Sequence, residues 1–309
     1  MILLLKPGRL PAQHWIDAFA AKMPELEVRL WPDVGDRAEV DVLFTVRIAE
    51  GEVARFPNLK FVALIAAGAD RLLADPDIPP HLPIVRSINP EMALTMKAWV
   101  VYQVVRHHRE MARYEADQAA HRWNRLAVVP PREVRIGVMG LGVLGGAAAR
   151  ALLDFGFDVA GWSRRGGSIE GIEDFIGPDG LRPFLTRSDI LVSILPFTKD
   201  TEGVLDADAF AALPKGAYVI NCGRGELVVE EDLKAALDSG HLLGAALDVF
   251  RTEPLPDDHP FWEHPLITMT PHNASTGSAW HAVDVVIENI RRCQAGEPLI
   301  ATVDRAAGY

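Results

Sequence analysis

A glycine-rich segment near the middle of the chain has the residue spacing of a dinucleotide-phosphate site. The apolar run Val134–Met139 leads into Gly140-x-Gly142-x-x-Gly145, and the alanine- and leucine-rich residues that follow favour a helix. In a strand–turn–helix unit the first glycine permits the tight turn, the second lets the backbone approach a pyrophosphate, and the third lets the helix pack closely. Free N–H groups at the helix N-terminus bind the phosphates. The segment predicts a dinucleotide site, with a glycine-rich structural turn as the alternative.

The next predicted strand ends in residues that favour one dinucleotide over the other. These residues are Trp162, Ser163, Arg164 and Arg165. An NAD site has a carboxylate about 20 residues beyond the glycine motif, where it accepts hydrogen bonds from the ribose. Here a hydroxyl and two guanidinium groups occupy that place, and guanidinium groups pair with phosphate in bidentate fashion. We therefore expect NADPH over NADH. A solvated loop charge is the alternative, more plausible for Arg165 than for Arg164.

Charged side chains follow several predicted strands in the second half of the chain. Arg224, Asp248, Glu253 and His272 each lie beyond the end of an apolar run. Open α/β sheets bind their ligands at the carboxyl edge of the strands, so these groups should gather at one edge. Each alone is more often a surface or core residue. Together, on a dinucleotide-binding fold, they indicate a catalytic site.

Short apolar runs alternate with segments of helical periodicity, which predicts parallel sheets covered on both faces. We expect strands at Ile2–Leu5, Val28–Leu30, Val40–Thr45, Phe61–Ala66, Ile84–Val85, Val134–Met139, Asp158–Gly161, Ile190–Ile194, Ala217–Ile220, Gly244–Leu247 and Ile267–Thr270. Helices are expected at Ala12–Lys22 and around Ala279–Gln294. A single long helix is expected from Glu91 to about Arg122, because this stretch contains no proline or glycine.

The elements predict an α/β protein with two doubly wound parallel-sheet domains of the Rossmann or flavodoxin type and an inter-domain cleft. The first domain is too short to hold its own last helix. We therefore expect the C-terminal helix to cross back, so that residues 1–95 and 280–309 form one discontinuous domain and residues 96–279 form the other. The alternative keeps the last helix on the second domain.

Composition agrees with a two-domain globular protein. The chain has 309 residues, of which 49% are hydrophobic and 24% charged, and domains average about 150 residues. The net charge of −11 disfavours nucleic acid as a partner. Two cysteines fit a reducing compartment. The apolar N-terminus is too short for a signal peptide, and no run approaches the roughly 18 residues of a membrane-spanning helix, so a cytoplasmic protein without a membrane partner is expected.

The motifs resemble those of the D-isomer-specific 2-hydroxyacid dehydrogenases over nearly the whole chain. Asn221-x-x-Arg224-Gly225, Glu253 and Pro271-His272 carry this resemblance. Further segments are similar to one branch, the NADPH-dependent glyoxylate/hydroxypyruvate reductases of the A type; they are Trp162–Arg164, Asp232–Gly240, Glu253–Pro256 and Val303–Tyr309. The resemblance implies an enzyme that uses NADP(H) to reduce glyoxylate, hydroxypyruvate or a similar short 2-ketoacid to its D-2-hydroxyacid, which is glycolate for glyoxylate.

The resemblance also implies roles for individual residues. Arg224 would hold the substrate carboxylate and polarise the ketone, and His272 would donate the proton as an imidazolium. Glu253 would pair with His272 and orient its ring. Asp248 would hydrogen-bond the nicotinamide carboxamide. The alternatives are loop acids for Glu253 and Asp248 and a buried structural histidine for His272.

The other implied contacts lie on loops after strands. Cofactor contacts are implied for Met139, Gly140, Leu141, Gly142, Val143, Leu144, Trp162, Ser163, Arg164, Arg165, Leu195, Pro196, Thr201, Cys222, Gly223 and Asp248. Cys222 also suits a small packing position, since hydride chemistry needs no thiol. Ala67, Gly68 and Ala69 would direct backbone N–H groups at the substrate carboxylate, together with Arg224 and His272. A glycine strand-to-helix turn is the alternative for the first three.

The dinucleotide-binding domain, 96–279, would thus be joined by a substrate-binding domain, 1–95 with 280–309. Residues 106–131 resemble the dimerisation arm of the family and imply a homodimer.

Val46-Arg47 stands where the branch has a tryptophan, so Arg47 would face a second acid group of the substrate. Lys97 stands where the family commonly has an acid and is interpreted as a surface residue. His107-His108 lacks a third ligand at suitable spacing, so no metal is expected.

Two other functions stay open. Some relatives sense dinucleotides without turnover, and a binding protein of that kind is the first alternative; the intact Arg224, Glu253 and His272 disfavour it. The second alternative is another 2-hydroxyacid dehydrogenase of the same family. The sequence does not rank the small ketoacids or give the direction of the reaction.

Overall fold

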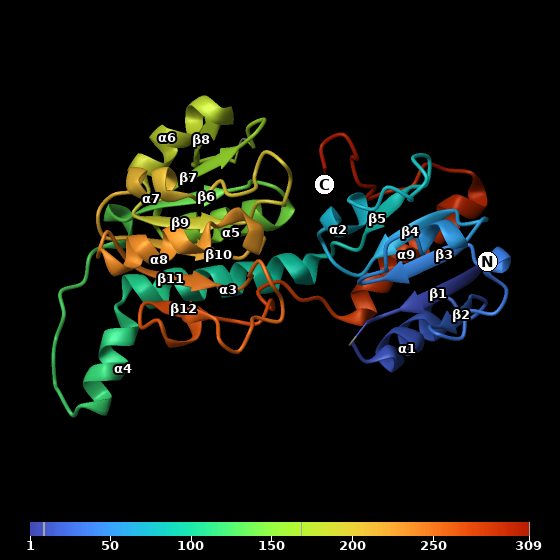
Figure 1. Cartoon of the computed structure of the whole chain (residues 1–309), viewed down its shortest axis with the longest axis horizontal. Coiled ribbons are helices and arrows are strands. Elements are labelled where there is room, and N and C mark those ends of the chain that lie inside the picture. The colour runs from blue at the N-terminus through green and yellow to red at the C-terminus, as the bar shows by residue number, and fades with distance from the viewer. Residues whose placement is uncertain (9, 168, 309) are drawn as a thin grey trace. The chain divides into compact units, whose positions relative to one another are not determined.

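Residues 1–8, 10–167 and 169–308 are described by the computed structural model, which divides into two units (Figure 1). The first unit comprises residues 1–91 and 277–309, and the second comprises residues 92–276. Each is a parallel sheet covered by helices, which confirms the predicted α/β class with two parallel-sheet domains. The boundaries between the two units lie between residues 91 and 92 and between residues 276 and 277. The sequence predicted them between residues 95 and 96 and between residues 279 and 280.

Within its described residues, the first unit has a five-stranded parallel sheet in the order β2-β1-β3-β4-β5. The strands are β1 (Ile2–Lys6), β2 (Glu27–Leu30), β3 (Val42–Thr45), β4 (Phe61–Leu64) and β5 (Ile84–Arg86). Helices α1 (Ala12–Lys22) and α9 (Ala279–Ala295) cover one face, and the short α2 (Asp70–Leu73) lies on the other. Successive residues of a strand point to opposite faces, so Leu3 and Leu5 join the α1/α9 core while Leu4 joins the other.

The C-terminal helix α9 belongs to the first unit. Its buried Val283, Val286 and Ile290 lie in the same core as Trp15 and Phe19 of α1. Both aromatic rings of α1 pack edge-to-face against Phe44 of β3, with ring centroids 5.3 and 5.8 Å away, an arrangement that aromatic pairs prefer.

The second unit has a seven-stranded parallel sheet among its described residues, in the order β12-β11-β10-β9-β6-β7-β8. The strands are β6 (Arg135–Met139), β7 (Asp158–Ser163), β8 (Glu173–Ile176), β9 (Ile190–Ser193), β10 (Ala217–Asn221), β11 (Leu242–Leu247) and β12 (Ile267–Met269). One face carries α3 (Pro90–His108) and α5 (Val143–Asp154); the other carries α6 (Gly177–Arg187), α7 (Ala207–Ala212) and α8 (Glu230–Asp238). The chain order reverses between β6 and β9, and such a switch point is where open sheets bind ligands.

The single long helix predicted from Glu91 to Arg122 is wrong. The chain leaves α3 at His108, adopts a left-handed backbone at Glu110 (φ 50°), and begins a separate helix α4 (Met111–Ala119). The Arg106 guanidinium donates to both carboxylate oxygens of Glu115 across this break, at 2.6 and 2.8 Å. Figure 1 shows α4 and the loop after it standing away from the sheet of the second unit.

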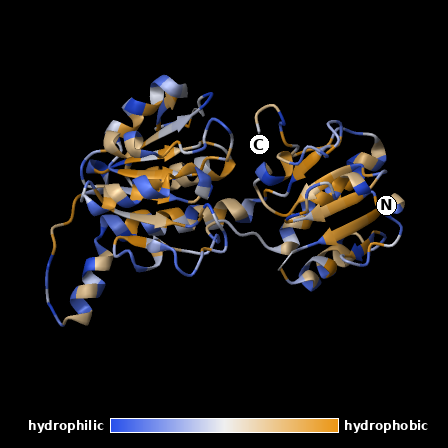
Figure 2. Ribbon diagram, viewed as in Figure 1, coloured by the Kyte–Doolittle hydropathy of each residue, from blue (hydrophilic) through white to orange (hydrophobic). Residues whose placement is uncertain are grey.

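Hydropathy separates the strands from their surroundings. The strands of both sheets are mostly hydrophobic in Figure 2, while the helices mix hydrophobic and hydrophilic residues. The polar exceptions are two edge strands, β2 with the sequence Glu-Val-Arg-Leu and β8 with the sequence Glu-Asp-Phe-Ile; the sequence did not predict β8. Across the described part of the chain, no helix is both long and apolar enough to cross a membrane.

Candidate active site

The glycine-rich loop joins β6 to α5 in the geometry that its glycines predict. Gly140 has a φ of +96°, a conformation that side chains rarely adopt. A Cβ on Gly145 would stand 1.8 Å from the Gly140 carbonyl oxygen, so this glycine lets α5 lie against the turn. A Cβ on Gly142 would meet no described atom within 4 Å. Gly142 also caps α5 without a side chain, so the helix N-terminus is open to an anion.

The end of β7 presents a hydroxyl and two cations beside this loop. The Trp162 indole is fixed by donating to the Gly177 carbonyl oxygen at 2.8 Å, and its own carbonyl accepts from the Gly140 N–H. The Ser163 Oγ is buried and has no hydrogen-bond partner among the described residues. Buried polar groups are almost always paired, so this hydroxyl fits a ligand group. Arg164 and Arg165 follow and are exposed. The residues present therefore fit a phosphorylated ribose.

Arg224 is held on a tight turn after β10. The side chain of the buried Asn221 spans this turn: its Nδ2 donates to the Arg224 carbonyl at 2.8 Å, and its Oδ1 accepts from the Gly223 N–H at 3.2 Å. The guanidinium Nη1 donates to the Gly223 carbonyl at 2.7 Å. The amide of Asn221 thus sets the backbone from which the cation extends.

Glu253 and His272 form a hydrogen-bonded pair. The Nδ1 of His272 lies 2.8 Å from Oε2 of Glu253, whose Oε1 accepts from the Phe250 N–H at 3.1 Å. Because the carboxylate can only accept, Nδ1 carries the hydrogen, and Nε2 is the nitrogen available to a ligand. The His272 side chain is 49% exposed. Its backbone is left-handed, with a φ of 54°. This conformation costs a non-glycine residue of order 1–3 kcal/mol, and residues that adopt it cluster at functional sites.

The loops that carry Arg224 and Glu253 touch. A Cβ on Gly225 would stand 1.9 Å from the Phe250 carbonyl carbon, so only a glycine allows this contact. The second unit therefore brings the Arg224 turn, Glu253 and His272 together at the carboxyl edge of β10, β11 and β12.

Asp248, just after β11, makes contacts that sequence reasoning missed. Its buried carboxylate accepts from the Thr270 hydroxyl, from the Asn273 N–H at 2.9 Å and from the Ala274 N–H at 2.8 Å. Burial, and then the negative charge of Asp248, raise the pKa of the Cys222 thiol well above its usual value. Cys222 is therefore a buried thiol, which suits packing and not nucleophilic chemistry.

The remaining predicted residues lie on loops of one unit or the other. In the second unit, Thr201 closes its own loop by donating from Oγ to the Pro196 carbonyl at 2.8 Å. Met139 and Leu195 are buried, whereas Val143 is exposed at the start of α5. Ala67, Gly68 and Ala69 lie in the first unit, between β4 and α2.

Residues 101–274 match the family model described as the NAD binding domain of D-isomer specific 2-hydroxyacid dehydrogenases. The chain belongs to this family. The predicted resemblance is therefore confirmed, and the second unit of this dehydrogenase contains the family's dinucleotide-binding domain.

Proteins similar to this dehydrogenase match it over nearly its whole length. The glyoxylate/hydroxypyruvate reductase A of Photorhabdus laumondii is 36% identical over 303 residues, covering 96% of each chain. A D-isomer specific 2-hydroxyacid dehydrogenase from Xanthobacter autotrophicus, solved with NADPH and MES, is 41% identical with a TM-score of 0.96, covering 100% of this chain and 99% of its own. An NADPH-dependent glyoxylate/hydroxypyruvate reductase from Sinorhizobium meliloti, solved with NADP and sulfate, is 36% identical with a TM-score of 0.94 and the same coverage.

Proposed function

We propose that this dehydrogenase uses NADPH to reduce glyoxylate, hydroxypyruvate or a similar short 2-ketoacid to the D-2-hydroxyacid. The observation that carries the proposal is the 2.8 Å pair of His272 with Glu253, on loops that meet the Arg224 turn at the carboxyl edge of the sheet. Relatives at 36–37% identity are glyoxylate/hydroxypyruvate reductases, which supports the substrate class.

The β6–α5 loop and the end of β7 would hold the cofactor. Gly140 permits the tight turn, and Gly142 leaves room for the pyrophosphate at the N-terminus of α5. Ser163, Arg164 and Arg165 would bind the 2′-phosphate, because a hydroxyl and guanidinium groups are donors that suit a phosphate. NADPH, when bound, supplies the hydride that reduces the carbonyl carbon next to the carboxylate. The complexes of relatives with NADPH and NADP support this choice.

Arg224 and His272 would act on the two reacting groups of the ketoacid, its carboxylate and its carbonyl oxygen. The Arg224 guanidinium would bind the carboxylate and place positive charge near the oxygen that becomes negative during reduction. His272 would give that oxygen a proton from Nε2, while Glu253 holds Nδ1 and stabilises the charged ring. The backbone N–H groups of Ala67, Gly68 and Ala69 are proposed as further carboxylate donors.

A substrate panel with both reduced cofactors tests this function. The wild-type enzyme is expected to oxidise NADPH with glyoxylate or hydroxypyruvate, followed at 340 nm. His272→Gln removes the proton donor and is expected to lower kcat roughly 10²–10⁴-fold, whereas the exposed His81→Gln serves as an unaffected control. Tight NADPH binding without turnover of any ketoacid would contradict the proposal and favour a dinucleotide-sensing protein.

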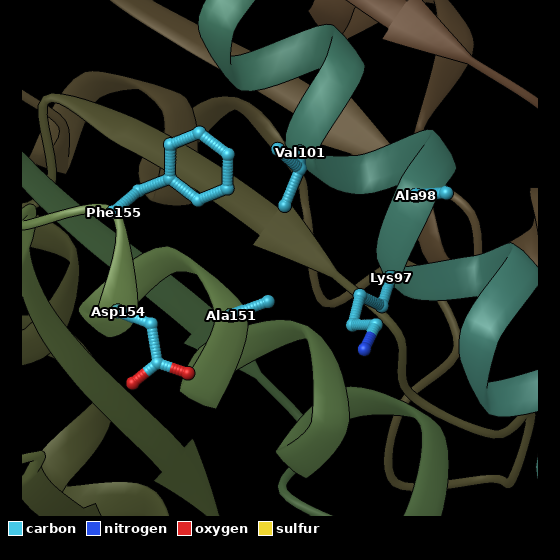
Figure 3. A pocket seen from close by; sticks show the side chains of 6 residues that line it. All are labelled: Lys97, Ala98, Val101, Ala151, Asp154 and Phe155. Atoms are coloured by element: carbon cyan, nitrogen blue, oxygen red, sulfur yellow. The ribbon is translucent and has the colours of Figure 1, made fainter.

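We further propose a homodimer built on α3, α4 and the arm 106–131. A groove between α3 and α5 is lined by Lys97, Ala98 and Val101 of α3, by Ala151 and Asp154 of α5, and by Phe155 (Figure 3). A neighbouring groove continues along Tyr102, Val105 and Met111. Exposed apolar side chains on the arm, above all Trp123, would be covered by a second copy.

A further inference from the structure

The Asp248 carboxylate forms hydrogen bonds with the turn that carries His272. It has a relative exposure of 1% and accepts from the Thr270 hydroxyl and from the N–H groups of Asn273 and Ala274. The Asp248 backbone joins the same arrangement, because its carbonyl accepts from the His272 N–H at 2.8 Å. Both the main chain and the side chain of one residue therefore hold the segment from Thr270 to Ala274.

These bonds anchor the turn to the sheet. The Asp248 N–H donates to the Asn221 carbonyl at 2.9 Å, and Asn221 also fixes the Arg224 turn. His272 stands in the middle of the segment with a left-handed backbone, a conformation that a non-glycine residue keeps only when its surroundings impose it. Hydrogen bonds to a carboxylate are stronger than those between neutral groups. The buried bonds to Asp248 are the strong interactions that can impose the left-handed conformation on His272.

We infer that Asp248 is a positioning residue for the proton donor: its carboxylate fixes the Thr270–Ala274 turn and so keeps the His272 ring against Glu253. This inference rests on the proposed function. It differs from a contact with the nicotinamide carboxamide, which the family resemblance implies for the same residue. The two roles are compatible in geometry, because Oδ2 accepts only the Ala274 N–H among the described residues and keeps a lone pair for another donor.

Substitutions at Asp248 and Thr270 separate the two roles. Asp248→Asn keeps the shape but turns an NH₂ group toward a backbone N–H of the turn, and we expect kcat with glyoxylate to fall at least tenfold. Thr270→Val removes one bond and leaves the carboxylate intact, with an expected fall of about threefold to tenfold, and Thr270→Ser restores the hydroxyl and the rate. The KM for NADPH is expected to stay within twofold in both Thr270 variants.

A double-mutant cycle with His272→Gln decides whether Asp248 acts through the histidine. If it does, Asp248→Asn costs less than twofold in kcat once the imidazole is gone. An equal loss in both backgrounds, or an unchanged kcat with a KM for NADPH raised more than fivefold, would overturn the inference and leave Asp248 as a cofactor contact.

Amide hydrogen exchange tests the turn without catalysis. Exchange at Asn273 and Ala274 should be at least tenfold faster in Asp248→Asn than in the wild type, while the core of β10 stays protected; unchanged exchange contradicts the inference. Amide exchange also separates the failure of the proposed function from the failure of the positioning role of Asp248. A wild-type enzyme that reduces no ketoacid would contradict the proposed function, but the effect of Asp248 on the turn could still be measured by exchange. Thr270→Val, the milder change, keeps the test valid if Asp248→Asn does not fold.

Discussion

At the scale of single residues, the end of β7 offers a test of cofactor choice. Arg164→Ala removes a guanidinium beside Ser163, whose buried hydroxyl lacks a partner among the described residues. We expect kcat/KM for NADPH to fall about tenfold or more, because a charge-assisted phosphate contact is lost, with kcat/KM for NADH nearly unchanged. Arg132→Ala, at an arginine whose side chain is 77% exposed, is the matched control. An NADPH/NADH ratio that stays at the wild-type value would contradict the assignment.

His107 couples stability to acid pH. Its ring stacks on Tyr218 with centroids 4.0 Å apart, and burial, helped by the nearby His108, lowers the pKa of His107 from 6.5 to about 4. Between these values the unfolded chain binds a proton that the folded chain does not. The contribution of His107 to the stability is therefore fully present above pH 6.5 and is lost as the pH drops toward 4, by about 3 kcal/mol.

The variant His107→Phe keeps an aromatic ring but cannot titrate. Its thermal unfolding temperature should fall less than that of the wild type between pH 7 and pH 5. His14→Gln, at an exposed histidine, should behave as the wild type does. Identical pH dependence in His107→Phe and the wild type would show that another group carries the acid sensitivity.

At the scale of elements, Gly225 controls the contact between the two loops that carry Arg224 and Glu253, which we propose to be catalytic. Gly225→Ala places a methyl group where the Phe250 backbone lies, so the Arg224 turn must move away from the loop of Glu253. We expect kcat/KM to fall at least tenfold and the unfolding temperature to drop. Gly146→Ala is the control, because its Cβ would make only ordinary contacts at 3.4 Å within α5, where alanine is favoured over glycine. Full activity in Gly225→Ala would show that the loops need not touch.

Strand interiors could be predicted from the sequence because burial on both faces leaves a continuous apolar run. In β9, for example, every residue from Ile190 to Ser193 is buried. Strand β8 has no such signal, since its edge position leaves Glu173 and Ile176 exposed. The break after α3 has none either, because Glu110 adopts a left-handed conformation without being glycine.

At the scale of the whole molecule, motif order predicted the family and the sheet class, but not how the site is supported. The pairing of Glu253 with His272 follows from motifs, and the structure has it at 2.8 Å. Two of the bonds that hold the Thr270–Ala274 segment to the Asp248 carboxylate come from backbone N–H groups, those of Asn273 and Ala274. Their direction is set by the turn conformation, which the side-chain types do not reveal.

The proposed homodimer is also a property of the whole molecule. The Trp123 side chain is fully exposed in the single chain, and Phe155 beside the α3 groove is 58% exposed. Exposed aromatic residues near a groove are typical of interface anchors, and truncating one costs about 2 kcal/mol or more of association. Trp123→Ser and Phe155→Ser should each raise the dimer dissociation constant about thirtyfold, as measured by sedimentation or light scattering over a dilution series. Ile176→Ser, at a similarly exposed residue of β8, should leave it unchanged. A wild-type chain that sediments as a monomer at micromolar concentration would refute the dimer, and the apolar groove along α3 would then need another occupant.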